Sequence, residues 1–219
     1  MKFFSQIGQD EYFIKKISKE KHNGFYLDVG ANDGVFCSNT AALEYYYGWT
    51  GICIEANPKL IPKLKNNRPK SIIVHKAIWK EPKQAKIEIP IKFRSDVPGD
   101  QLGRLINIDD IDKRNENYFR NEFQGQTEIF DVETDTITNV LDSNEFCGVI
   151  DYMSLDTEGA ELEALQGIDF NKIHINFMTI EHGDRIGMKE KFIEYLKPIG
   201  YKLHRINKWD IEFENSKKL

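Results

Sequence analysis

The chain has 219 residues, of which 40% are hydrophobic and 12% aromatic, and it carries a formal net charge of -5. A chain of this length and composition predicts one globular domain with a sizeable core. Because 30 basic residues are interspersed with 35 acidic ones, no face is set up to neutralise a phosphate backbone. We therefore expect no nucleic acid as a partner.

The three cysteines, Cys37, Cys53 and Cys147, lie far apart and form no C-x-x-C pair, so neither a disulfide framework nor a zinc site is indicated. The opening MKFFSQIGQDEYF lacks the sustained apolar region of a signal peptide. No later segment approaches ~18 uninterrupted apolar residues. We expect a cytoplasmic protein without direct membrane insertion.

In the first third of the chain, apolar runs of strand length alternate with helical patterns. The predicted elements are a strand at 25–31, a helix at 38–47, a strand at 50–56, a helix at 58–67 and a strand at 71–79. Asn57 followed by Pro58 marks the start of the second helix, and Gly48 ends the first. This alternation predicts a parallel sheet with helices on both faces.

The stretch from Lys80 to Phe130 interrupts this pattern. It contains one possible strand at 86–93, followed by a long polar segment with glycine and proline. A long insertion in a compact domain is more often a lid or a binding segment than part of the scaffold. We predict that residues of about 83–128 form a substrate lid.

The regular pattern then resumes. The predicted elements are a helix at 135–143, a strand at 151–157, a helix at 160–167, a strand at 173–183, a helix at 187–198 and two strands at 201–206 and 209–213. The last two flank Asn207-Lys208, a short link that suits an antiparallel hairpin. No internal repeat or low-complexity linker is found, so residues 1–219 are interpreted as a single domain.

Candidate ligand-binding residues follow the predicted strands, as expected for sheets that bind ligands outside their carboxyl ends. The first strand carries Asp28 and runs into a loop with Gly30 and Gly34, which would leave room for a ligand. Glu55 ends the second strand, where an acidic residue commonly accepts hydrogen bonds from ribose hydroxyls. A tight turn followed by a solvent-exposed Glu55 is the alternative.

The spacing of the glycines in this loop restricts the class of ligand that it can bind. It reads G-x-x-x-G rather than G-x-G-x-x-G, so the arrangement that brings a pyrophosphate onto the helix is missing. This weighs against NAD and FAD, and leaves a nucleoside without a diphosphate.

Several segments, in order, resemble the FkbM-type methyltransferases over nearly the whole chain. SLDTEGAELEALQGID resembles the family's D-x-E-G-x-E segment, and SQIGQDEYF is similar to its opening S-Q-x-G-[QE]-D. YLDVGANDGVFCSNTAALE and GICIEANPKLIPKLKNNRP are similar to its glycine segment and to its second strand with E-x-N-P. FMTIEHG resembles its fifth-strand ending.

This resemblance implies a class I methyltransferase (Rossmann-like) α/β fold. We expect a mostly parallel seven-stranded sheet with helices on both faces and a C-terminal antiparallel hairpin. The implied methyl donor is S-adenosyl-L-methionine, and the implied reaction is methylation of oxygen, frequently on a sugar or polyketide hydroxyl.

The donor is cationic, so the carboxylates of Asp28 and Asp156 would supply nearby negative charge. The N-terminal segment 1–23 is predicted to fold over the cofactor pocket, although its polar residues could instead only cap the first helix. The residues predicted to bind the cofactor are Gln9, Asp10, Asp28, Gly30, Asn32, Gly34, Glu55, Ala56, Ala77, Ile78 and Asp156.

Methyl transfer to an alcohol depends on positioning of the acceptor oxygen and is helped by a general base. His182 is the first candidate for this base, because it follows the fifth strand directly and imidazole titrates near neutral pH. Asp156 and Glu158 compete for the role, and a structural role for His182 stays open.

We predict no metal. If a divalent cation orients a pair of hydroxyls instead, Asp156, Glu181 and His182, together with Glu158 and Asp184, are the candidate ligands.

The sequence thus predicts an S-adenosylmethionine-dependent O-methyltransferase with a carbohydrate acceptor, a sugar or a glycan. A polyketide or other small-molecule O-methyltransferase is the alternative among enzymes, and a non-catalytic nucleoside-binding module is the alternative outside them. A nucleic-acid methyltransferase is disfavoured by the charge. Membership of a larger glycan-synthesis polypeptide or complex stays open.

Overall fold

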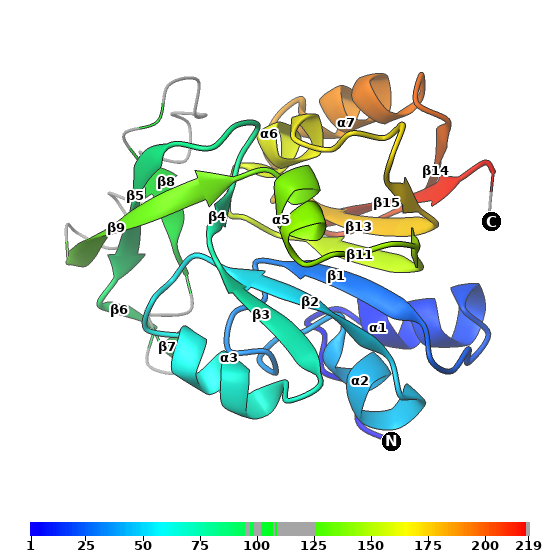
Figure 1. The fold of residues 1–219 in the computed structure, drawn as a ribbon, viewed down its shortest axis with the longest axis horizontal. Coiled ribbons are helices and arrows are strands. Elements are labelled where there is room, and N and C mark those ends of the chain that lie inside the picture. Colours follow the sequence, from blue (N-terminus) through cyan, green and yellow to red (C-terminus); the bar gives the residue numbers. More distant parts are fainter. Residues whose placement is uncertain (95–96, 99–101, 107, 109–125, 218–219) are drawn as a thin grey trace.

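The computed structural model describes residues 1–94, 97–98, 102–106, 108 and 126–217, and its main sheet has seven strands (Figure 1). Their order across the sheet is β14 (Tyr201–Asn207), β15 (Asp210–Asn215), β13 (Phe177–Glu181), β11 (Tyr152–Leu155), β1 (Phe25–Val29), β2 (Thr50–Glu55) and β3 (Ser71–His75). Neighbours from β13 to β3 run parallel. β15 runs antiparallel to β13 and β14, so the predicted mostly parallel sheet and C-terminal hairpin are confirmed.

Helices cover both faces of this sheet, as predicted (Figure 1). One face carries α5 (Ile137–Ser143), α6 (Glu161–Gln166) and α7 (Met188–Leu196). The other carries α1 (Gln9–Tyr12), the π-helical turn η1 (Phe13–Ile17), α2 (Ala41–Tyr47) and α3 (Ile61–Asn67). No helix in the described part of the chain combines the length and apolar character that a membrane crossing needs.

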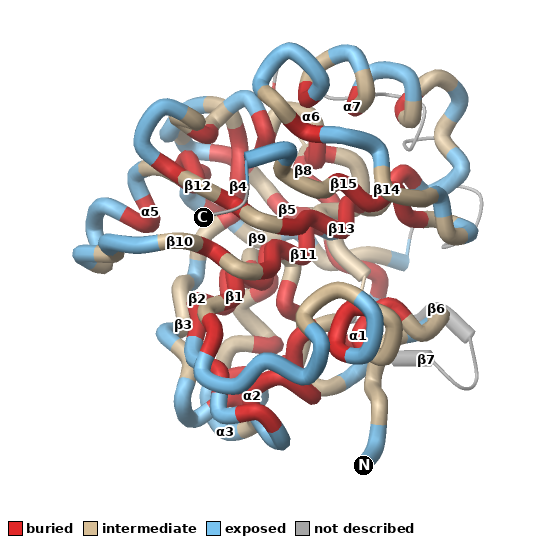
Figure 2. The backbone as a smooth tube through the Cα atoms, turned by 90° about the vertical axis from the view of Figure 1, so that its right-hand side faces the viewer, coloured by how far each residue is buried: buried red, intermediate tan, exposed pale blue. Residues whose placement is uncertain are grey.

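Each face of the sheet has its own apolar core, because strand side chains alternate between the two faces. Leu27 and Val29 pack toward α5, α6 and α7, whereas Tyr26 packs toward α2 and the N-terminal segment. Phe13 of that segment is buried and stacks on Tyr152, with ring centroids 4.1 Å apart. The N-terminal segment is therefore anchored in the core. Figure 2 shows that buried residues are concentrated along β1, β11 and β13 in the middle of the molecule, whereas exposed residues are common in the outer turns.

Of two helix boundaries predicted from local sequence, one agrees with the structure and one does not. Gly48 ends α2 with φ of 69°, in the left-handed region that glycine adopts readily, as predicted. The helix expected from residue 58 begins at Ile61 instead. The Asn57 side chain accepts a hydrogen bond from the Lys59 amide at 2.9 Å, so it stabilises a turn before the helix.

A second, smaller sheet stands beside the first. The run 71–79, predicted as one strand, divides into β3 and β4 (Ala77–Ile78), and β4 joins β9 (Thr127–Asp135), β5 (Gln84–Pro90) and β8 (Arg104–Ile106) in the order β4-β9-β5-β8. Two further pairs are β6 (Lys92–Arg94) with β7 (Val97–Pro98), and β10 (Val149–Ile150) with β12 (His174–Ile175).

The second sheet changes the interpretation of the insertion. Trp79, Ile87, Ile89, Leu105 and Val132 form a small apolar core, so both ends of the insertion are regular structure. β9 was not anticipated as a strand. Much of the predicted lid, including 109–125, lies outside the described residues.

Candidate active site

Two hollows open at the edge of the main sheet where the parallel strands end. The larger pocket has an empty volume of about 630 Å³ and opens to solvent. It is formed at the ends of β1, β2, β4 and β11, with one wall from the second sheet. Its lining residues are Val29, Gly30, Asn32, Ile54, Glu55, Ala56, Lys76, Ala77, Ile78, Ile87, Gly103, Leu105, Asp156, Thr157 and Glu158.

Glu55 gives the larger pocket its fixed polar group. The side chain is buried, and its two carboxylate oxygens accept hydrogen bonds from the backbone amides of Asn32 at 2.7 Å and Asn57 at 2.8 Å. Burial raises the pKa of Glu55, while the backbone donors favour its charged form. Ala77 and Ile78 add an apolar wall. A fixed hydrogen-bond acceptor beside an apolar wall suits a nucleoside.

The two glycines of the first loop make room for protein rather than for a ligand. Gly30 has φ of 84°, and a Cβ there would lie 1.6 Å from the carbonyl oxygen of Asp156. Gly34 has φ of 85°, and its Cβ would lie 2.5 Å from Cγ of Arg68. Gly30 lines the larger pocket and Gly34 does not, so of the two glycines only Gly30 lies beside the space that a ligand could fill.

Asp28 lines neither hollow, contrary to its expected role beside a cationic ligand. It accepts a hydrogen bond from the Thr40 hydroxyl and lies 3.7 Å from Nη1 of Arg68. Arg68 is fully buried, and it also pairs with Glu44 at 3.0 Å and donates to the carbonyl of Gly34 at 3.1 Å. Asp28 therefore belongs to a buried ionic network behind the pockets, which the sequence did not reveal.

The smaller pocket lies beside the larger one and has an empty volume of about 380 Å³. It is formed by β11, β13, the start of β15, the N-terminal segment and the loop before α2. Its lining residues are Gln6, Gln9, Cys37, Asn39, Leu155, Asp156, Thr179, Glu181, Trp209 and Asp210. Asp156 lines both pockets, so they meet at the end of β11.

Gln9 and Asp10 have different places in the structure. Gln9 lines the smaller pocket, and its amide nitrogen donates to the carboxylate of Asp210. Asp10 is fully buried and accepts hydrogen bonds from the Phe4 amide at 2.6 Å and the Ser5 hydroxyl at 2.5 Å. Asp10 lines neither pocket, and it stabilises the turn that brings Gln9 to the site.

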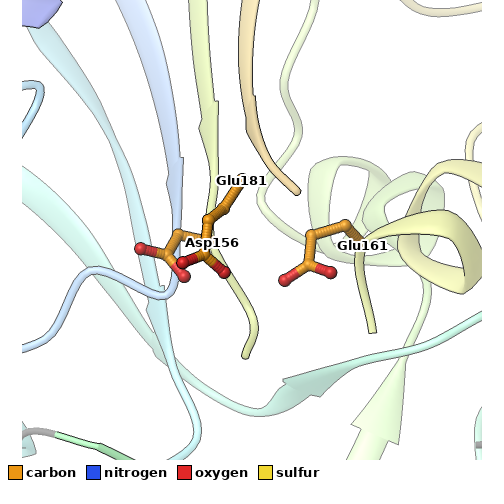
Figure 3. Close-up of side chains that lie close together, drawn as sticks. All are labelled: Asp156, Glu161 and Glu181. Atoms are coloured by element: carbon orange, nitrogen blue, oxygen red, sulfur yellow. The ribbon is translucent and has the colours of Figure 1, made fainter. Parts of the chain in front are cut away.

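Three carboxylates converge below the junction of the pockets. One oxygen each of Asp156, Glu161 and Glu181 lies within 4.8 Å of the others, and Figure 3 shows Glu161 facing the adjacent pair Asp156 and Glu181. The guanidinium of Arg185 lies 2.6 Å from Glu161 and 3.6 Å from Glu181. The chain itself thus places one cation among these groups.

The crowding of carboxylates changes their acidity. Asp156 as a residue is exposed to solvent. Protein atoms around its carboxylate nevertheless desolvate the charged form and, followed by the negative charge of Glu158, raise the pKa of Asp156 above its usual range. Burial, followed by the charge of Glu161, raises the pKa of Glu158 to about 7. Burial and the charge of Asp156 likewise raise the pKa of Glu181. Groups of this kind can accept or release protons near neutral pH.

His182, the first candidate for the general base, is not brought to the site. It is fully buried and lines neither pocket. Its Nδ1 accepts a hydrogen bond from the Asp184 amide at 3.0 Å, and burial lowers its pKa. Successive strand side chains point to opposite faces, so Glu181 faces the smaller pocket and His182 faces away. Asp156 and Glu158 are the predicted catalytic candidates that the structure places in a pocket.

Asp210 is a pocket residue that the sequence reasoning missed. It lies directly opposite Glu181 in the antiparallel pairing of β13 and β15. The signal was present, because the first residue of a strand antiparallel to β13 must lie at the edge where β13 ends. Ile87, Gly103 and Leu105, which wall the larger pocket, gave no comparable signal.

The strand order, the helices on both faces and the fixed Glu55 at the end of β2 are those of the class I methyltransferase fold, whose members use S-adenosylmethionine. The sequence matches the family model described as the methyltransferase FkbM domain over residues 28–203. The chain therefore belongs to the FkbM methyltransferase family. No curated protein matches the chain.

Solved structures resemble the fold at low identity. A methyltransferase FkbM from Methylobacillus flagellatus KT has a TM-score of 0.49 and 14% identity, over 88% of this chain and 43% of that one. The METTL16 methyltransferase domain has a TM-score of 0.50 and 10% identity, over 92% of this chain and 63% of that one. A provisionally assigned RNA methyltransferase, PH1948 from Pyrococcus horikoshii, has a TM-score of 0.47 and 10% identity, over 95% and 83%. The chain thus spans less than half of the Methylobacillus protein.

Proposed function

We propose that this methyltransferase acts on oxygen and that its acceptor is a sugar or a glycan. The observation that carries the proposal is the smaller pocket, a mainly polar hollow that meets the larger pocket at Asp156. A polyhydroxylated acceptor offers O–H donors to such a lining, which contains carboxylates, amides and a hydroxyl.

The larger pocket fits the adenosyl part of S-adenosylmethionine. Glu55, held by two backbone amides, is placed to accept hydrogen bonds from ribose hydroxyls, and Ala77 and Ile78 would contact the adenine. Gly30, Asn32 and Ala56 complete this part of the lining. The bound cofactor supplies an activated methyl group.

The chain's own residues would orient the acceptor and take its proton. Asp156 lies where the pockets meet, so its carboxylate would lie beside the reacting atoms of donor and acceptor. Glu158 lines the larger pocket, and a pKa of about 7 suits a group that exchanges a proton near neutral pH. We propose these two residues as the catalytic pair.

The other acceptors fit the pockets less well. A polyketide favours a closed apolar cavity, whereas Leu155 and Trp209 are the main apolar contributions to the smaller pocket. A nucleic acid would bring phosphates toward Asp156, Glu181 and Asp210. A non-catalytic nucleoside-binding module has no need for a second polar pocket.

The test is incubation with isotopically labelled donor and a panel of sugars and glycans, followed by mass and linkage analysis of the product. We expect a methyl ether on one hydroxyl, and we expect the variant Asp156→Asn to bind the donor but to form little product. Donor binding without methylation of any sugar would contradict the proposal. Methylation of RNA or of an apolar small molecule under the same conditions would replace it.

A further inference from the structure

The smaller pocket has an unusual charge balance. Its lining includes three carboxylates, Asp156, Glu181 and Asp210, and no lysine, arginine or histidine among the described residues. Two arginines in segments next to the pocket are already engaged. Arg185 pairs with Glu161 and Glu181, and Arg205 donates to both carboxylate oxygens of Glu212 at 2.6 and 2.7 Å.

Asp210 is the most enclosed of these three carboxylates. Its exposed fraction is 6%, it lies opposite Glu181 in the sheet, and it accepts a hydrogen bond from Gln9 of the N-terminal segment. Gln9 is itself held, because its amide oxygen accepts from the Ile7 amide at 3.0 Å. A carboxylate that is enclosed and fixed acts on its surroundings through a lower dielectric than one on the surface.

We infer that the smaller pocket selects its acceptor by charge, taking neutral sugars and amino sugars and rejecting sugars that carry a carboxylate, sulfate or phosphate. In this arrangement Asp210 and Glu181 accept hydrogen bonds from hydroxyl or ammonium groups of the acceptor. An anionic acceptor would be placed beside these carboxylates, and the lining offers it no cation within the described part of the chain. The ammonium of Lys208 lies outside this lining, 4.8 Å from the ring centroid of Trp209. The inference rests on the proposed function, since it assumes that the acceptor is a carbohydrate.

The charge of Asp210 carries most of this selection. Glu181 lies 3.6 Å from the guanidinium of Arg185. The hydrogen-bond partner of Asp210 is the neutral amide of Gln9, and the positive charge of nearby Arg205 is offset by Glu212. Burial raises the pKa of Asp210 to about 6, so the group is ionised at pH 8. Replacing it by asparagine keeps its size and an oxygen for Gln9 while it removes the charge.

The experiment compares glucose, glucosamine and glucuronate presented in the same glycosidic context at pH 8. We expect kcat/KM for the glucuronate compound to be at least tenfold below that for glucose, with glucosamine equal to or above glucose. In Asp210→Asn the ratio of glucose to glucuronate should fall at least fivefold. Glu190→Gln removes one exposed charge on α7, outside both pockets, and should leave the ratio unchanged.

A binding measurement separates this inference from the proposed function. Calorimetry with the S-adenosylhomocysteine-loaded protein reports which of the three sugars binds, whether or not a methyl group is transferred. Equal or tighter binding of glucuronate, or no binding of any of the three, would overturn the charge selection. An unchanged ratio in Asp210→Asn would remove Asp210 as its source. Binding in the expected order without methylation would leave charge selection standing and contradict the O-methyltransferase proposal.

Discussion

Glu55 is the residue on which the adenosyl assignment depends most directly. Glu55→Gln keeps the side-chain length but removes the negative charge, and one of the two backbone amides then faces an NH₂ group instead of an oxygen. A hydrogen bond to a charged group contributes about 1.5–3 kcal/mol. We therefore expect the dissociation constant for S-adenosylmethionine to rise by about tenfold to a hundredfold, measured by calorimetry.

The control for Glu55→Gln is Glu190→Gln, which changes an exposed glutamate on α7. Its donor affinity should match that of the unaltered protein. Unchanged affinity in Glu55→Gln itself would show that the ribose lies elsewhere.

Alanine substitutions at Gly30 and Gly187 separate the cost of backbone strain from the cost of a steric clash. Both have positive φ, 84° and 78°, but a Cβ on Gly30 would lie 1.6 Å from the Asp156 carbonyl oxygen, whereas one on Gly187 meets nothing within 4 Å. Gly187→Ala should cost about 1 kcal/mol, from backbone strain alone. Gly30→Ala should cost several kcal/mol more, because the loop after β11 must move.

Urea denaturation of both glycine variants measures these costs, and donor binding gives a second readout. A displaced Asp156 should weaken donor binding in Gly30→Ala and leave it unchanged in Gly187→Ala. Equal stabilities would show that the clash is relieved without cost.

At the scale of elements, Arg68 joins the end of α3 to β1, α2 and the glycine loop. Arg68→Met fills much of the same volume but leaves Asp28 and Glu44 buried without their cation. Removing one partner of a buried ion pair typically costs about 3–5 kcal/mol. We expect a loss of that size in the free energy of unfolding, measured by urea denaturation.

A triple variant tests whether uncompensated charge causes that loss. Arg68→Met combined with Asp28→Asn and Glu44→Gln should regain part of the stability, because no buried charge is left unpaired. A triple variant less stable than Arg68→Met would show that packing by the guanidinium, which lies 5.0 Å from the Tyr26 ring centroid, dominates instead.

The elements differ in how well their sequence predicted them. The alternating pattern predicted the parallel sheet and the C-terminal hairpin because buried strands and short connections leave strong local signals. It missed the division of 71–79 into β3 and β4, and it missed β9, because pairing with a distant strand decides those elements. Likewise, Glu55 followed from its place at a strand end, whereas the Arg68 network depends on residues that meet only in the fold.

The neighbouring residues Glu181 and His182 show the same limit within the site. The sequence predicted that both residues lie at the end of β13, but it did not predict the face of the sheet toward which each side chain points. A shift of one residue exchanges the pocket for the interior. The chemistry of imidazole favoured His182 as the general base, but in the structure Glu181 lines the smaller pocket and His182 is buried.

At the scale of the whole molecule, the site sets the pH dependence of stability. Burial raises the pKa of Glu158 to about 7 and that of Asp210 to about 6, whereas the ordinary values are 4.5 and 3.8. Between the ordinary and the raised values the folded state binds more protons than the unfolded state. Its stability therefore falls as the pH rises through this window.

We expect the donor-free protein to be more stable to urea at pH 5 than at pH 7.5, by roughly 2 kcal/mol for each carboxyl that must ionise while buried. Opposing contributions come from Glu44, whose pKa is lowered by hydrogen bonds from Ser71 and Tyr26 and by Arg68 despite its burial. Glu44 stabilises the fold above its unfolded pKa, so its contribution is lost below the interval from pH 5 to 7.5. Within the interval His182 opposes the site carboxyls, because burial lowers its pKa and only the unfolded chain gains its proton below about pH 6.5.

The double variant Glu158→Gln with Asp210→Asn identifies the source of this slope. It should flatten the pH dependence between pH 5 and 7.5 and should be more stable than the unaltered protein at pH 7.5, because neither buried group then has to ionise. The same variant should lose methyl transfer, since active sites often retain groups that lower the stability of the fold. A slope that persists in the double variant would place the uptake of protons at other groups, such as Asp156 and Glu181, whose pKa values are also raised. A gain of stability without a loss of transfer would remove Glu158 and Asp210 from the reaction.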